Sequence, residues 1–128
     1  MIDRKQLTDE KLINISVSLA LQDALVNEIY PSMRRVVGCI NHSKNKFVLL
    51  IIYEGEMPGG FAELMDAVLA QAMIGLPDDF DATLQLERID YPSLYEYSAD
   101  GWYCFYAYFP HEEIEFDTVN KVKLYLNG

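Results

Sequence analysis

The chain has 128 residues, of which 51% are hydrophobic and 23% are charged, and its formal net charge is -10. This composition is typical of a folded globular protein and excludes a disordered chain. The length predicts a single domain over residues 1–128. An acidic charge of this size argues against nucleic acid and membrane partners, because their phosphates would be repelled.

Residues 8–29 are predicted to form the first helix, with Thr8 as its cap. Residues 13–18 also alternate as a strand would, but they pass into the following apolar stretch without a breaker, so we prefer the helix. Pro31 is expected to end it, because proline removes a backbone donor. The apolar positions at steps of three and four are Ile13, Val17, Ala20, Leu21, Ala24 and Leu25.

Seven consecutive apolar residues from Phe47 to Tyr53 form the stretch around which we expect the core to be built. They are too few to span a bilayer and have no polar face, so they predict a strand covered on both faces. With residues 34–40 and the polar turn at 42–46 they predict an antiparallel hairpin. Cys39 here and Cys104 later each lie in an apolar run, where a thiol is most often a small buried hydrophobe, and we expect no disulfide between them.

After a loop at residues 54–60, a second helix is expected to begin at Phe61 and to end where Gly75 adopts the left-handed conformation. A third strand follows, in which leucines alternate with polar residues, and a change of phase near Arg88 predicts a bulge. The predicted apolar face of the second helix comprises Phe61, Leu64, Met65, Val68 and Ala72.

The rest of the chain is predicted to contain a loop at residues 92–101, a strand at 102–109 and a terminal element. Residues 112–128 fit a short helix, which we prefer, and residues 122–126 fit a strand equally well. The order helix, hairpin, helix, hairpin predicts an α+β fold. We expect an antiparallel sheet of about four strands with the helices packed on one face.

No motif for catalysis or for a cofactor is found in the sequence. His42 and His111 lack the closely spaced partners of a zinc site, so we expect no metal. No serine lies in a nucleophile elbow, and the glycines at 55, 59 and 60 lie in an acidic loop without the lysine of a phosphate-binding loop. We therefore predict no enzymatic activity and no cofactor. The N-terminus lacks the apolar segment of a signal peptide, which favours a cytoplasmic location.

The charge is distributed unevenly. Residues 54–117 hold fifteen Asp and Glu against the single Arg88, and seven Tyr and Trp residues lie between positions 91 and 108. Acids steer a basic partner, and exposed tyrosines bury a large rigid area in an interface. Tyr95 and Tyr97, in a predicted loop, are harder to explain as core residues. The predicted partner-binding residues are Glu54, Glu56, Asp78, Asp79, Asp81, Asp90, Tyr95, Glu96, Tyr97 and Asp100.

The order of landmarks resembles a family of small bacterial proteins. Residues 20–31 lead to Arg34, a strand is closed by the sequence Tyr-Glu-Gly at 53–55, and after a helix residues 88–92 read Arg-Ile-Asp-Tyr-Pro before an aromatic strand. This is similar to the immunity proteins of contact-dependent growth inhibition systems, a class of polymorphic toxin systems. The resemblance implies a binding protein without enzymatic activity that plugs the active site or an exosite of a cognate toxin domain, including toxins that are nucleases. Separately, we expect the chain to be a monomer or a weak dimer.

Two other classes of function stay open. The chain could be a regulatory or adaptor domain that binds another basic protein or associates with itself through an exposed sheet face. It could also be a small enzyme that uses paired carboxylates, although fifteen acids in 64 residues make some close pair inevitable.

Overall fold

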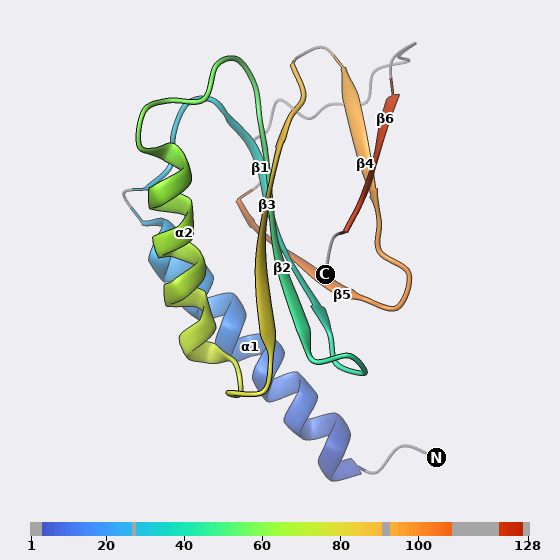
Figure 1. The fold of residues 1–128 in the computed structure, drawn as a ribbon. Coiled ribbons are helices and arrows are strands. Elements are labelled where there is room, and N and C mark those ends of the chain that lie inside the picture. The colour runs from blue at the N-terminus through green and yellow to red at the C-terminus, as the bar shows by residue number, and fades with distance from the viewer. Residues whose placement is uncertain (1–3, 27, 91–92, 109–120, 127–128) are drawn as a thin grey trace.

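The computed structural model describes residues 4–26, 28–90, 93–108 and 121–126. Figure 1 shows three layers, with the helices on one face of a central sheet and a pair of strands on the other face. The α+β class is therefore as predicted. The elements are α1 (Arg4–Leu25), β1 (Met33–Asn41), β2 (Lys46–Tyr53), α2 (Phe61–Ala72), the short 3-10 helix η1 (Met73–Gly75), β3 (Asp81–Arg88), β4 (Leu94–Ser98), β5 (Tyr103–Tyr108) and β6 (Lys121–Tyr125).

The central sheet has the strand order β3-β2-β1-β5 and is mixed. The predicted hairpin is confirmed, because β1 and β2 pair antiparallel with Ile40 opposite Phe47. The prediction of a wholly antiparallel sheet is wrong, because β3 pairs parallel with β2 and β5 pairs with β1 instead of forming a hairpin with β3. The reason is α2, which returns the chain to the end of the sheet where β2 began, so β3 runs in the same direction as β2.

Strand β2 lies at the centre of the core and is covered on both faces, as predicted. Phe47, Leu49 and Ile51 pack with the helices, whereas Leu50 and Ile52 pack with residues of β4 and β6. All five are fully buried. Each such side chain stabilises the fold by about 1.5–3 kcal/mol relative to an exposed position, which explains why a strand without a polar face forms here.

Residues 13–18 belong to helix α1, so the preferred helix is confirmed and the strand alternative is wrong. The buried face of the helix includes Val17, Leu21, Ala24 and Leu25. Its predicted bounds were wrong at both ends. Thr8 lies inside the helix, and the helix ends at Leu25, six residues before Pro31. The backbone N–H groups of Val26 and Glu28 instead donate to carbonyls three residues earlier. This turn leads the chain to Tyr30, whose ring lies 5.2 Å from the ring of Phe61 in an edge-to-face contact.

Helix α2 begins at Phe61 as predicted and buries the predicted face, with Leu64 half-buried at its margin. The role predicted for Gly75 is wrong, since among the described glycines those with positive φ are Gly55, Gly60 and Gly101. Gly75 closes η1, and a Cβ atom placed there would lie 2.7 Å from the backbone Cα and N atoms of Val17. The glycine is therefore needed because α1 and η1 approach closely.

The second face of the sheet carries the two-stranded parallel sheet formed by β4 and β6. Strand β4 replaces the loop predicted at residues 92–101, and β6 replaces the preferred terminal helix at residues 121–125. Both pack on the central sheet because Tyr95 of β4 and Leu124 of β6 are buried in a cluster with Val37 and Leu50. The register of β3 with β2 is regular through Arg88, so the bulge predicted there is absent from the described strand.

The described sheet is irregular where β1 pairs with its neighbours: its register with β2 shifts between Met33 and Arg35, and its register with β5 shifts between Val36 and Val37. The predictions for His111 and for residues 112–120 lie outside the described residues. In the portion of the chain that the structure describes, no helix is both long enough and apolar enough to cross a bilayer.

Candidate functional site

Two loops meet at one end of the central sheet, which we call the acidic end and define by Glu54, Glu56, Arg88 and Asp90. The first loop leaves β2 and the second leaves β3, and the parallel pairing of these strands brings both to the same end. The Asp90 carboxylate accepts a hydrogen bond of 2.8 Å from the backbone N–H of Gly55, which joins the loops. Gly55 has a φ of 74°, a conformation that glycine adopts without strain.

The electrostatics of the acidic end centre on one exposed ion pair. The Arg88 guanidinium donates from Nε to Oδ1 of Asp90 at 3.1 Å and from Nη2 to Oδ2 at 3.3 Å. This bidentate contact, and after it the Gly55 N–H, lowers the pKa of Asp90, while Asp90 raises the pKa of Arg88. Glu56 is exposed in the same loop, so the exposed charges of this end are those of Glu56, Arg88 and Asp90, with Glu54 partly buried beside them in the sequence.

A buried arginine holds the second loop in place. Arg34 is 2% exposed, and its Nη1 donates to the carbonyl oxygens of Ile89 and Ser93, each at 2.8 Å. Its guanidinium carbon lies 5.0 Å from the centre of the Tyr95 ring. Arg34 thus anchors the segment on both sides of Asp90 and positions the acidic end without belonging to its surface.

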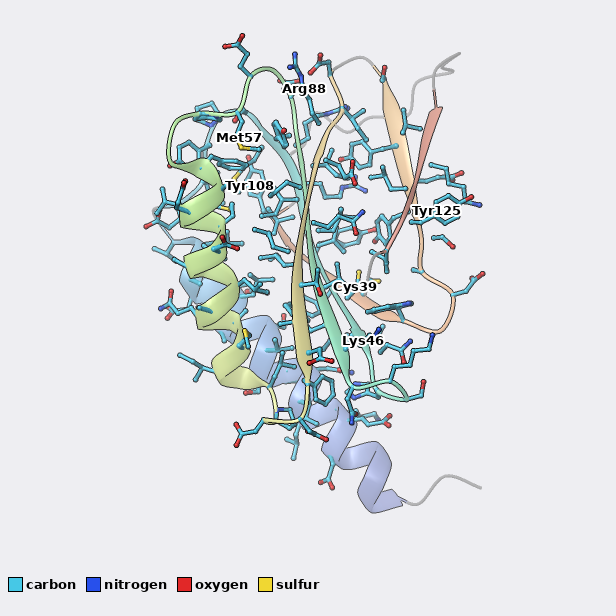
Figure 2. The ribbon with its side chains drawn as sticks, in the orientation of Figure 1. Cys39, Lys46, Met57, Arg88, Tyr108 and Tyr125 are labelled. Atoms are coloured by element: carbon cyan, nitrogen blue, oxygen red, sulfur yellow. The ribbon has the colours of Figure 1, made fainter. Side chains whose placement is uncertain are left out.

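Asp78, Asp79 and Asp81 lie at the opposite end of the sheet. Asp79 accepts a hydrogen bond from the side chain of Asn45, and Asp81 lies beside Lys46 in the pairing of β3 with β2. Figure 2 shows Lys46 and Arg88 at the two ends of the sheet. Strand β3 separates these ends by about 23 Å at 3.3 Å per residue. This end therefore also groups three carboxylates, with Lys46 as the neighbouring cation and Asn45 as a neutral donor.

The remaining predicted site residues belong to β4 and the turn that follows it. Tyr95 is 8% exposed, with the guanidinium carbons of Arg34 and Arg35 each 5.0 Å from its ring centre, so it is a core residue. Glu96 and Asp100 are exposed, and Tyr97 is half-buried with its hydroxyl 3.2 Å from that of Tyr106. Burial is the main cause that raises the pKa of Tyr97, and this hydrogen bond adds to it. The ten predicted residues therefore form three separate groups.

Sequence reasoning missed several exposed residues that could contact a partner. Tyr106, in β5, is 49% exposed, and Tyr125, in β6, is 66% exposed. Because β5 is apolar or aromatic at every position, its sequence does not alternate and does not indicate that Tyr106 lies on an exposed face. The exposure of Tyr125 depends on the pairing of β6 with β4, which is distant in the sequence. Met57, 41% exposed, stands directly after Glu56 and was predicted only as part of a loop. Figure 2 places it towards the same end of the sheet as Arg88.

The described residues contain no group of three or more His, Cys, Asp or Glu side chains that could hold a metal ion. No pocket is found in that part of the chain either.

A family model described as MafI2 immunity protein matches residues 14–107. The matched segment runs from α1 into β5 and includes both loops of the acidic end. No curated protein matches the chain at a significant level.

Proposed function

The chain belongs to the MafI2 immunity protein family, and we propose that its acidic end binds a basic, nuclease-type toxin domain. Membership makes it an immunity protein of a polymorphic toxin system. The proposal has three further parts. The toxin is a nuclease, it is delivered by contact-dependent growth inhibition, and this chain neutralises it in the cytoplasm by binding alone. The acidic end would cover the basic surface with which a nuclease holds its substrate.

The observation that carries the proposal is the contact between Asp90 and the N–H of Gly55. This bond fixes the two loops relative to each other, so the carboxylates are presented from an ordered backbone. Less conformational entropy is then lost on binding than with a free loop. The same loop presents Met57, an apolar residue of a type enriched in interfaces, beside Glu56.

Charge supports the same partner. A nuclease presents cationic groups to the phosphates of its substrate, and a chain with net charge -10 attracts such a surface over several ångströms. Steering of this kind raises the association rate and weakens as salt screens the charges. Exposed Tyr106 and Tyr125 lie elsewhere on the surface, and we propose that they contact the toxin only if its footprint extends over β5 and β6.

The test uses the toxic domain encoded beside this chain, in a growth-rescue assay and in measurements of association at several salt concentrations. Replacing both Glu54→Gln and Glu56→Gln should slow association about 3–10-fold at low salt and flatten its salt dependence. Met57→Ala should instead speed dissociation about fivefold, the equivalent of about 1 kcal/mol.

The matched control removes the same charge from the opposite end of the sheet, as Asp78→Asn with Asp81→Asn. This pair should change association by less than about twofold, because these residues lie about 23 Å from the acidic end, beyond the Debye length at physiological salt. Equal effects of both pairs would contradict the acidic end as the binding site. Rescue without any salt-sensitive complex would contradict the basic partner.

One observation favours self-association as a second candidate function. The face of α1 opposite its buried residues is apolar, and the spacing of its exposed residues follows the seam by which helices pair. A second copy of this chain would cover it. Sedimentation at about 100 µM should then show a dimer that Leu19→Glu converts to a monomer, and a monomeric wild type would exclude it. The exposed apolar residues are Leu12, Ile15, Leu19 and Val26.

A further inference from the structure

Cys39 and Cys104 are direct neighbours across two strands. Cys39 of β1 is opposite Cys104 of β5 in their antiparallel pairing, and the two sulfur atoms lie 2.6 Å apart, each as a free thiol. Opposed residues of antiparallel strands have Cα atoms about 4.5–5.5 Å apart. Disulfides join Cα atoms about 4.4–6.8 Å apart, so a bond here requires no displacement of the backbone.

The two thiols have different environments. Cys39 is fully buried in the cluster beneath β4 and β6, whereas Cys104 packs at the margin of that cluster and is partly exposed. Figure 2 shows Cys39 on the side of the central sheet that faces these strands. The hydrogen bond between the sulfurs lowers the pKa of Cys104 and raises that of Cys39, which burial raises further. Cys104 is therefore the thiol that ionises first and meets solvent.

We propose that Cys39 and Cys104 form a reversible disulfide, with Cys104 as the attacking thiol, Cys39 as the resolving thiol and a small hydroperoxide as the oxidant. The oxidant must be small because the Cys104 sulfur is only partly exposed, at the margin of the cluster beneath β4 and β6. The pair is a modification site of the folded chain and is independent of the toxin-binding surface.

The chemistry has two steps. The Cys104 thiolate attacks one oxygen of hydrogen peroxide, the O–O bond breaks, and the hydroxide that leaves is protonated to water. The Cys104 sulfenic acid is then attacked by the Cys39 sulfur, the S–O bond breaks, and the hydroxide leaves with the Cys39 proton as a second water. The two sulfurs lose two electrons and the peroxide gains two. Excess thiol reverses the reaction by exchange.

The bond would join an edge strand to the centre of the fold. In the described sheet β5 pairs with β1 and is held to it by backbone hydrogen bonds. A disulfide between residues 39 and 104 closes a loop that contains β2, α2, β3 and β4. Such a link restricts the unfolded chain, so the oxidised protein should melt about 5–15 °C higher than the reduced protein.

The test treats the reduced full chain with a slight excess of hydrogen peroxide. The expected result is the loss of both free thiols with a mass decrease of two hydrogen atoms, a cross-linked peptide containing both cysteines, and full recovery of the thiols with dithiothreitol. Oxidation of Cys104 to a sulfinic acid in the wild type, or only disulfides between two chains, would overturn the proposal.

Two single variants test the order of the steps. In Cys39→Ser the sulfenic acid of Cys104 has no resolving partner, so a dimedone adduct should accumulate at Cys104. In Cys104→Ser the buried Cys39 should stay reduced under the same treatment. The opposite assignment of the adducts would refute the roles, and the wild-type measurement stands even if a variant does not fold.

Discussion

The substitution Gly75→Ala tests the closest contact between the helical elements. The new methyl group would lie 2.7 Å from the Cα and N atoms of Val17 and 2.8 Å from the carbonyl carbon of Ser16. Ordinary contacts of a Cβ atom begin at 3.4 Å. Because these neighbours are backbone atoms of a helix, η1 and α1 must separate, which strains the packing on both sides.

The size of the effect follows from overpacking, which costs about 1–3 kcal/mol. A chain of 128 residues has an unfolding entropy of about 0.27 kcal/mol/K at about 2.1 cal/mol/K per residue. The melting temperature should therefore fall by about 4–11 °C. Thermal unfolding followed by circular dichroism measures the shift, and urea unfolding gives the free energy.

Two further variants isolate the cause. Gly59→Ala makes the same change in a loop where nothing lies within 4 Å, so its free energy of unfolding should stay within about 0.5 kcal/mol of the wild type. Gly75→Asn tests whether the glycine is needed for a left-handed backbone conformation instead of for the close contact. Asparagine adopts the left-handed conformation more readily than alanine does. A Gly75→Asn protein clearly more stable than Gly75→Ala, or a neutral Gly75→Ala, would refute the steric explanation.

Three other outcomes are expected from the contacts of the sheet. Arg34→Met should lower the free energy of unfolding by about 2–4 kcal/mol, because the carbonyls of Ile89 and Ser93 lose a charged donor; urea unfolding measures it. The lowered pKa of Asp90 means that its stabilisation is complete above its ordinary value of 3.8 and is lost as the pH falls through the folded-state pKa. An acid titration of stability should thus be less steep for Asp90→Asn than for the wild type. Gly38→Ala should cost about 1–3 kcal/mol, since the Phe105 ring fills the space of the missing side chain, and a double-mutant cycle with Phe105→Leu should show partial rescue.

Local patterns predicted the elements whose partners are close in the sequence. The β1-β2 hairpin follows from two apolar runs separated by a polar turn, and α2 follows from the helical spacing of its apolar residues. Strands β4 and β6 have five residues each and pair across more than twenty intervening residues. The helical and extended alternatives for β6 were equally good locally, and only the contact of Leu124 with the buried cluster decides between them.

Tyr95 shows why the candidate site was harder to predict than the core. Its segment looked like a polar loop, since the tyrosines are separated by Glu96 and flanked by serines. A residue type favoured in interfaces is equally suited to lie under a second layer of strands, and burial depends on whether that layer exists. The ring of Tyr95 is buried because β4 packs on the central sheet and places it beside the guanidinium groups of Arg34 and Arg35.

The direction of β3 determines which acids can act together. Glu54 follows β2 and Asp90 follows β3, so these residues share one end of the sheet only because the two strands are parallel. If β3 ran antiparallel to β2 in the same position, Asp90 would lie beside the β1-β2 turn and its lysines, and Asp81 would lie beside Glu54. The same fifteen acids would then have produced a different surface. The acidic end is therefore a property of the β2-α2-β3 connection, and its charge cannot be assigned from composition before the strand directions are known.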